Sequence, residues 1–278
     1  MNTVDVNGAK LAYVESGSGP NSMLLVHGWA CDHTALAPIR SHFRYTYRVV
    51  AVDLRGHGRS DKPQQEYTVS GFSDDLAVLC RELGLRKSFV IGHSMGGTVA
   101  LDLAARHNNL LSAVVLIDSV IFPRPDLIEE LRPLATALSG EHYREALQQT
   151  VSSLFVPTDD PERKSRLLSA MAAVPQHVLI SSFRNHITEY DATQSASQCR
   201  VPVAYIAAAQ KLAGLDRFLA VCPQLMVGQT LGSGHFSPLE VPDQVNAMIE
   251  RFCANVGHST DSESDREVGD SRFLVGCS

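Results

Sequence analysis

The spacing of hydrophobic residues changes several times along the chain, and each change predicts an element. Residues 3–16 alternate apolar and polar side chains around Asn7-Gly8, a dipeptide typical of a two-residue turn, which predicts an N-terminal β-hairpin. Four short, mostly apolar segments are too short for helices and predict buried strands, at residues 23–26, 48–52, 89–91 and 113–117. Between these segments, residues 70–83 and 98–106 are predicted to be helices. Strands that alternate with helices predict a parallel sheet with helices on both faces.

This pattern stops near residue 120. Residues 120–198 contain no convincing strand and favour amphipathic helices separated by prolines, at 125–138, 141–154, 161–173 and 175–189. The alternating pattern then resumes with a strand at 201–206, a short helix at 213–221, a weaker strand at 224–227 and a last helix at 241–254. From residue 257 the chain is polar, acidic and without periodicity, which predicts disorder.

Together these patterns predict an α/β protein. Its core, residues 1–119 and 199–256, is a mostly parallel twisted sheet with helices on both faces. Residues 120–198 are expected to form an inserted helical lid, and residues 257–278 a disordered tail.

Composition and charge indicate which kinds of protein and partner the chain is compatible with. The chain has 278 residues, of which 44% are hydrophobic and 19% charged, and this suits one globular domain with an insertion. The net charge of -6 and the lack of a long basic cluster indicate neither nucleic acid nor an anionic membrane surface as a partner. No apolar run reaches the ~20 residues of a membrane span, and no signal peptide is recognised. Six scattered cysteines without a C-x-x-C motif are then expected to be reduced core thiols, and the expected location is the cytoplasm.

The strongest chemical signal is Gly92-His-Ser-Met-Gly96, a G-x-S-x-G motif. It lies between the apolar run that ends at Ile91 and the helical segment 98–106, so its context is strand, sharp turn, helix. Glycines let the strand and the helix approach closely, and the turn raises the Ser94 hydroxyl above the sheet at the N-terminus of a helix. Ser94 is therefore a candidate nucleophile.

Three further motifs accompany this turn: His27-Gly28-Trp29, the loop Asp53-Leu-Arg-Gly-His-Gly-Arg-Ser60, and Gly234-His235-Phe236. With them the chain resembles the α/β-hydrolase superfamily, over residues 1–118 and 200–255. The resemblance implies a chain order of Ser, acid and His, with the base late in the chain. His235 is the only histidine in the late part of the core and is the predicted base.

The other histidines are expected to have structural roles or to be exposed to solvent. His27 is expected to hold the loop that follows it, the side chain of His93 is expected to leave the turn away from the Ser94 hydroxyl, and His258 belongs to the tail. The three histidines of the insertion are expected to be solvated on helix faces: His142, His177 and His186.

The acid has two candidates. Many relatives place it after the strand predicted at 201–206, but there this chain has Lys211, and Asp216 follows a few residues late. Other branches place it after the preceding strand, where Asp118 ends the run Val-Leu-Ile-Asp. A carboxylate at the carboxyl end of a parallel strand faces the crevice where ligands bind, so Asp118 is preferred and Asp216 is the alternative.

The resemblance also implies an oxyanion hole made of the backbone N–H groups of Trp29 and Met95. The side chains of Trp29, His93 and Cys31 are expected at the substrate pocket, with Cys31 as wall and not as nucleophile.

The predicted activity is a serine hydrolase that cleaves a small carboxylic ester, lactone or thioester through an acyl-enzyme on Ser94, without metal or organic cofactor. A cofactor-free dioxygenase that cleaves quinolone rings remains an alternative on the same fold, suggested by Gly28-Trp-Ala-Cys-Asp-His33 and Gly234-His235-Phe236. Met95 and Cys31 stand where that resemblance calls for histidines. A C–C bond hydrolase is a third possibility, and a non-catalytic receptor a fourth. The sequence does not indicate the oligomeric state.

Overall fold

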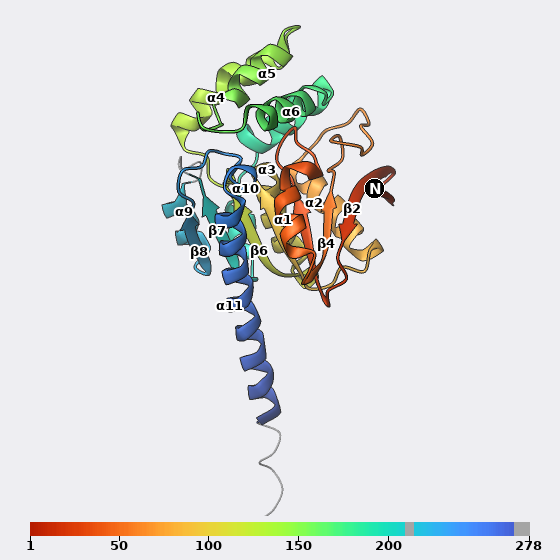
Figure 1. Cartoon of the computed structure of the whole chain (residues 1–278), viewed down its shortest axis with the longest axis vertical. Helices are drawn as coiled ribbons and strands as arrows, with labels where there is room; N and C mark the ends of the chain where they lie inside the picture. The colour runs from red at the N-terminus through yellow and green to blue at the C-terminus, as the bar shows by residue number, and fades with distance from the viewer. Residues whose placement is uncertain (209–213, 270–278) are drawn as a thin grey trace, which may run out of the picture.

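The computed structural model describes residues 1–208 and 214–269, with side-chain environments up to Val256. Its centre is one sheet whose eight described strands have the order β1-β2-β4-β3-β5-β6-β7-β8 (Figure 1). The strands are β1 (Asn2–Val6), β2 (Ala9–Ser16), β3 (Asn21–Val26), β4 (Tyr47–Val52), β5 (Ser88–His93), β6 (Leu111–Ile117), β7 (Val203–Ala207) and β8 (Leu225–Gln229). Strands β3 to β8 pair in parallel, whereas β1 with β2 and β2 with β4 are antiparallel. The mostly parallel α/β fold is thereby confirmed.

The N-terminal hairpin is built as its turn residues predict. Asn7 and Gly8 both have positive φ, 47° and 78°, as a two-residue turn that matches the twist of the strands requires. Strand β1 pairs with β2 from Asn2 opposite Tyr13 to Val6 opposite Ala9.

Helices cover both faces of the sheet, because successive residues of the buried strands point to opposite sides and both sets are apolar. On one face, strand residues such as Leu24 and Val90 pack with α2 (Val69–Glu82), α3 (Met95–Arg106) and α9 (Leu215–Val221). On the other face, residues such as Leu25 and Ile91 pack with α1 (Ala37–Phe43) and α11 (Pro242–Gly269).

Some elements differ from the prediction. The 3-10 turn η1 (His33–Leu36) and helix α1 have no predicted counterpart, since a seven-residue helix with a proline in its first turn carries little periodic signal. Short elements that the pattern also missed are η2 (Asn108–Leu110), α8 (Thr193–Gln198) and α10 (Ser237–Glu240).

The predicted end of the last helix is wrong. Helix α11 runs to Gly269 instead of residue 254, and no proline interrupts this stretch. The predicted disordered tail therefore falls partly on this helix, and its residues 270–278 lie outside the described residues. Figure 1 shows α11 projecting away from the sheet.

Residues 120–198 are helical, as predicted. They form α4 (Pro125–Ala137), α5 (Tyr143–Ser152), α6 (Pro161–Ala172), α7 (Gln176–Phe183), the π-helical turn η3 (Arg184–Thr188) and α8. The predicted helix 175–189 is thus interrupted at Phe183 by a wider turn. Figure 1 shows α4, α5 and α6 stacked over one end of the core.

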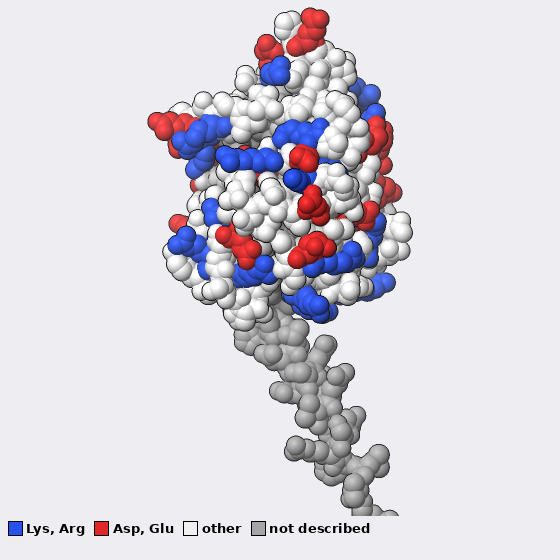
Figure 2. Space-filling model, turned by 90° about the vertical axis from the view of Figure 1, so that its right-hand side faces the viewer, with Lys and Arg blue, Asp and Glu red and all other residues white. Residues whose placement is uncertain are grey.

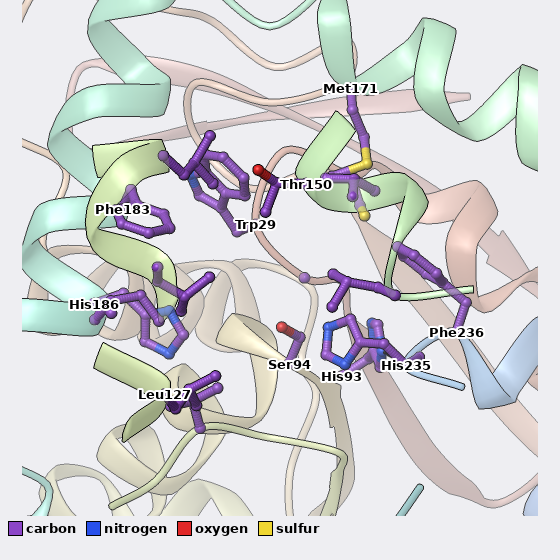
Figure 3. A pocket seen from close by; sticks show the side chains of 18 residues that line it. Trp29, His93, Ser94, Leu127, Thr150, Met171, Phe183, His186, His235 and Phe236 are labelled. Carbon is purple, nitrogen blue, oxygen red and sulfur yellow. Dashed lines mark hydrogen bonds between the residues drawn. The ribbon is translucent and has the colours of Figure 1, made fainter. Parts of the chain in front are cut away.

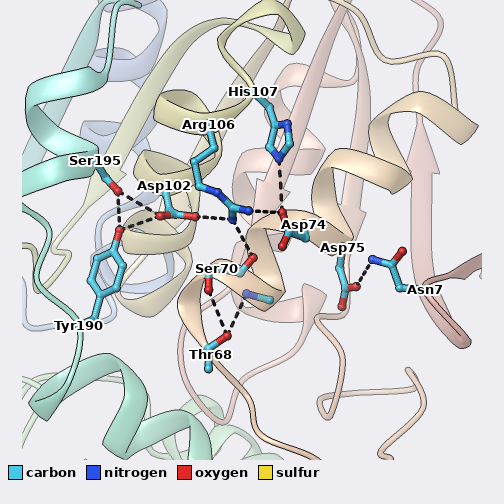
Figure 4. A network of polar contacts seen from close by, with 11 residues as sticks. Asn7, Thr68, Ser70, Asp74, Asp75, Asp102, Arg106, His107, Tyr190 and Ser195 are labelled. Atoms are coloured by element: carbon cyan, nitrogen blue, oxygen red, sulfur yellow. Dashed lines mark hydrogen bonds and ion pairs between the residues drawn. The ribbon is translucent and has the colours of Figure 1, made fainter.

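The last part of this insertion is tied to the core by hydrogen bonds to the buried carboxylate of Asp102. The Tyr190 hydroxyl donates a hydrogen bond to Asp102 of α3 over 3.0 Å, and the Ser195 hydroxyl donates to the same carboxylate oxygen over 3.0 Å (Figure 4). Arg106 donates to the other oxygen of Asp102 over 3.2 Å. Asp102 is buried, so these partners replace the water that its charge would otherwise need.

Surface charge is mixed on the face that Figure 2 presents, where acidic and basic side chains are interspersed. Among the helices of the described residues, none combines the length and the apolar content that crossing a bilayer requires.

Candidate active site

The turn that carries Ser94 is strained and tightly packed. Ser94 has φ 53° and ψ −123°, a conformation that non-glycine residues rarely adopt. A Cβ atom on Gly96 would collide with the carbonyl oxygens of Val26 and His27, so only glycine allows α3 to start this close to β3. The backbone N–H of Ser94 donates to the carbonyl of Ile117 over 2.9 Å, which holds the turn on β6.

His235 and Asp118 meet although 117 residues separate them in the chain. The Nδ1–H of His235, in the loop between β8 and α10, donates to Oδ2 of Asp118 over 2.7 Å. Oδ1 of Asp118 accepts from the backbone N–H of Ala208 over 3.1 Å, so both carboxylate oxygens are engaged. Asp118 is only 1% exposed and directly follows β6 with φ 44°. The carboxylate is therefore placed to orient the imidazole ring of His235.

Asp216 lies elsewhere. It is exposed in the first turn of α9 and has no hydrogen bond to His235. Of the two predicted candidates for the acid, the geometry thus joins Asp118 to the histidine. Lys211, at the position more usual for the acid, lies outside the described residues.

His93 forms a hydrogen bond with the main chain of His235. Its Nε2–H donates to the backbone carbonyl of His235 over 2.7 Å. Burial, together with the nearby ring of His235, lowers the pKa of His93 to about 3, so the ring is neutral near pH 7. His93 lines the cavity as predicted, and in addition it fixes the main chain that carries His235.

Two backbone N–H groups near Ser94 come from different elements, Trp29 from the loop after β3 and Met95 from the start of α3. Nε2 of His27, in the loop after β3, accepts a hydrogen bond from the backbone N–H of Leu54 over 3.0 Å. The ring proton is therefore on Nδ1, which donates to the carbonyl of Gly28 over 2.8 Å. The backbone N–H groups of Trp29 and Met95, the two predicted donors, find no acceptor among the described residues.

Side chains of the same loop form part of the cavity wall. The Trp29 indole N–H donates to the carbonyl of Leu179 over 3.3 Å, and its ring lies edge-on against Phe183 with centroids 5.2 Å apart. Trp29 therefore lines the cavity and also anchors α7. Burial raises the pKa of the Cys31 thiol to about 12, which fits a wall residue and not a nucleophile.

The cavity that contains Ser94 lies between the core and the insertion (Figure 3). Its described lining is mostly apolar, and it comprises Gly28, Trp29, Cys31, His93, Ser94, Val120, Leu127, Leu131, Leu134, Thr150, Val151, Leu154, Met171, Phe183, His186, Ile187, His235 and Phe236. Figure 3 shows the Ser94 hydroxyl pointing into this space, with His93 and His235 on one side and His186 on the other. The Ser94 hydroxyl makes no hydrogen bond with any described residue, so it is free to meet a ligand.

Comparison with known proteins adds to this geometry. A family model described as alpha/beta hydrolase fold matches residues 21–170, more than half of the chain. The chain belongs to this family of α/β hydrolases.

Several named proteins are similar to this hydrolase. A 2-(acetamidomethylene)succinate hydrolase from Mesorhizobium japonicum is 27% identical over 269 residues, which cover 90% of this chain and 93% of that protein. A soluble epoxide hydrolase from Corynebacterium sp. is 32% identical over 164 residues, 59% of this chain and about half (52%) of the relative. A thermophilic esterase from Thermogutta terrifontis, solved with malate bound, superposes with a TM-score of 0.81 at 25% identity and covers 92% of this chain and 99% of that one.

Two polar residues of the hydrolase's cavity were not predicted. His186 was expected to be solvated, but it is 4% exposed and lines the cavity, while Thr150 of α5 lines it from the insertion. Their helices are amphipathic in the sequence, but which helix face meets the core depends on how the insertion packs. The expectation of solvent contact does hold for His142, whose side chain is 89% exposed.

Metal ligation has no support in the described part of the hydrolase, where no group of three or more His, Cys, Asp or Glu side chains could hold an ion. Its described cysteines are free and buried thiols: Cys31, Cys80, Cys199, Cys222 and Cys253.

Proposed function

We propose that this hydrolase cleaves a carboxylic ester, with lactones and thioesters as chemical equivalents, through an acyl-enzyme on Ser94. The observation that carries the proposal is the 2.7 Å contact between His235 Nδ1 and Asp118 Oδ2 at the cavity into which Ser94 points. A serine hydroxyl is a weak nucleophile until an oriented base takes its proton, and this arrangement supplies one.

The steps follow from the positions of these groups. With Nδ1–H bound to Asp118, Nε2 of His235 is unprotonated and takes the Ser94 proton as Oγ attacks the substrate carbonyl. The backbone N–H groups of Trp29 and Met95 would then stabilise the oxyanion, each contributing roughly 2.7–4 kcal/mol by analogy with other oxyanion-hole donors. His235 gives its proton to the leaving alcohol, and water releases the acyl group by the same route.

The identity of the nucleophile argues against epoxides as substrates. Attack of Ser94 on an epoxide carbon would form an ether, which has no carbonyl group for water to attack, so the enzyme would be alkylated and not regenerated. Attack on an ester carbonyl forms a new ester, which the same residues can hydrolyse. The nucleophile thus favours acyl transfer.

The cavity wall favours neutral, mainly apolar substrates. Among the described residues that line it, none is Lys or Arg, and most are aliphatic or aromatic. A carboxylate buried there would lack the cationic partner that its charge requires. We therefore propose a substrate without the two carboxylates that the name of the Mesorhizobium relative implies.

The dioxygenase alternative gains less support. Met95 and Cys31 stand where that resemblance calls for histidines, and the pKa of Cys31, raised by burial to about 12, prevents the thiol from acting as a base near pH 7. C–C bond hydrolysis would use the same nucleophile and base, and a substrate panel separates it from ester hydrolysis.

Replacement of Ser94 tests the proposal. Ser94→Ala removes one hydroxyl and should lower kcat on 4-nitrophenyl esters by about 10⁴- to 10⁶-fold, without a change in thermal unfolding. A fluorophosphonate probe should label Ser94 of the parent protein, seen by peptide mass spectrometry, and should leave the variant unlabelled. The proposal is wrong if Ser94→Ala keeps more than a tenth of the activity on every accepted ester, or if oxygen uptake with quinolones replaces ester turnover.

A further inference from the structure

His186 is a polar side chain in an otherwise apolar part of the cavity wall. It is 4% exposed, comes from the π-helical turn η3, and lies across the cavity from Ser94 and His235 (Figure 3). One of its two ring nitrogens, Nε2, lies 3.0 Å from the hydroxyl oxygen of Thr98. The other, Nδ1, has no hydrogen-bond partner among the described residues.

The hydrogen bonds of Thr98 assign the protons of this ring. The Thr98 hydroxyl donates its single proton to the carbonyl of Val120 over 3.3 Å. Because a carbonyl oxygen cannot donate, both contacts of the Thr98 hydroxyl are hydrogen bonds only when the hydroxyl accepts from the ring. This assigns the proton of His186 to Nε2 and leaves a lone pair on Nδ1. Burial, reinforced by the charge of a protonated His235, lowers the pKa of His186 to about 3, which keeps the ring neutral near pH 7.

The backbone around His186 departs from an α-helix. Helix α7 ends at Phe183, and the next turn widens so that Glu189 N–H donates to the carbonyl of Arg184, five residues earlier, over 3.1 Å. Such π-turns are rare and occur frequently at functional sites. Here the wider turn carries the ring that faces the substrate cavity.

We infer that His186 is a specificity-determining residue whose Nδ1 accepts a hydrogen bond from a hydroxyl or N–H group of the substrate. The inference rests on the proposed ester hydrolysis and narrows its substrate class to neutral esters or lactones that carry such a donor near the scissile carbonyl. A buried acceptor loses its water when substrate fills the cavity, so a substrate without a donor leaves it unpaired. Sites built in this way discriminate strongly against analogues that lack the group.

A purely structural role is the competing explanation. His186 would then only link η3 to α3 through Thr98, and its replacement would affect all esters alike. The two roles are separated by a ratio: kcat/KM for a hydroxy ester divided by kcat/KM for its methoxy analogue, which has the same oxygen but no donor.

The experiment measures this ratio on a small panel. It contains 4-nitrophenyl esters of both enantiomers of 2- and 3-hydroxybutanoate, and 2-hydroxyethyl butanoate for the alcohol side, each with its methoxy analogue, plus unsubstituted 4-nitrophenyl butanoate. The parent enzyme should favour at least one hydroxy ester by about tenfold or more. In His186→Leu this ratio should fall about tenfold. His186→Asn places an amide near the position of Nδ1 and should retain most of the preference, which also covers the case that the leucine variant does not fold.

Thr150→Val is the matched control, because Thr150 is the other polar side chain that the insertion contributes to the described lining. It should leave the ratio within about threefold of the parent value. A parent enzyme without any preference, a preference that survives in His186→Leu, or one lost in Thr150→Val alone would each overturn the inference. Turnover of the unsubstituted ester without preference would leave the proposed function standing, whereas failure to hydrolyse any ester together with no probe labelling of Ser94 would remove both.

Discussion

Asp118 combines backbone strain with full engagement of its side chain. Its φ of 44° is unfavourable for a residue with a Cβ, at a cost of roughly 1–3 kcal/mol, yet the turn aims one oxygen at His235 and the other at the N–H of Ala208. Strain of this kind persists where the surroundings enforce it, as they do here at the end of β6.

Asp118→Asn should therefore impair catalysis far more than it impairs folding. An amide at this position would hold the ring in the wrong tautomer, and kcat should fall by about 10⁴-fold by analogy with other triads. Asp216→Asn is the matched control: its exposed carboxylate should change kcat by less than about tenfold. Steady-state kinetics of both variants show which aspartate orients His235. A loss of kcat confined to Asp216→Asn would assign this role to Asp216, which follows the later strand.

At the scale of elements, the site depends on how closely β5 and α3 pack against β3. At Gly96 of α3, an added Cβ atom would overlap the backbone oxygens of Val26 and His27, which cannot move aside as a side chain can. The position of Ser94 thus depends on Gly96, which has no reactive side chain.

Gly96→Ala should destabilise the protein by roughly 1–3 kcal/mol, the usual cost of overpacking, and should lower kcat/KM because it shifts the turn that carries Ser94. Gly140→Ala is the control, since the nearest atom to its added Cβ is a carbonyl oxygen at 3.4 Å, an ordinary contact distance. Urea unfolding and ester kinetics measure both effects. Equal stability and equal activity in the two variants would contradict this account of the turn.

At the scale of the whole molecule, several histidines are enclosed without charge. Burial lowers the pKa values of His57, His93 and His186 to about 3. In the unfolded chain a histidine titrates near 6.5, so below that pH the unfolded state binds more protons than the folded state. The free energy of unfolding must therefore fall as the pH falls below about 6.5.

Each enclosed histidine should remove about 1.4 kcal/mol of stability per pH unit below 6.5, or about 2 kcal/mol between pH 7 and pH 5. His57 lies outside the cavity lining, so His57→Gln isolates this effect from substrate binding. Urea unfolding at both pH values should show a loss that is smaller in the variant by about 2 kcal/mol. An identical loss in both proteins would mean that His57 is not held neutral in the folded state.

Much of the fold could be predicted because its signals are local. Period-two and period-3.6 spacings reflect the geometry of a single strand or helix, and continuous apolar runs reflect burial on both faces. The hairpin at Asn7-Gly8, the six parallel strands, the turn at Ser94 and the helical nature of residues 120–198 follow from such signals. Where the signal is weak, the prediction fails. Helix α1 has no predicted counterpart, and the π-turn at Arg184–Thr188 is predicted as part of an ordinary α-helix.

By itself, the sequence determined the α/β class, the candidate nucleophile Ser94 and the candidate base His235, because these depend on the spacing within each element, on short motifs and on the order of both along the chain. It left open whether Asp118 or Asp216 meets that base, and it placed His186 in solvent. The tertiary structure decided both points, since a hydrogen bond across 117 residues and the face that a helix buries depend on how separate elements pack. Packing of the insertion against the core brings His186 to the cavity, and no pattern within the insertion alone encodes that contact.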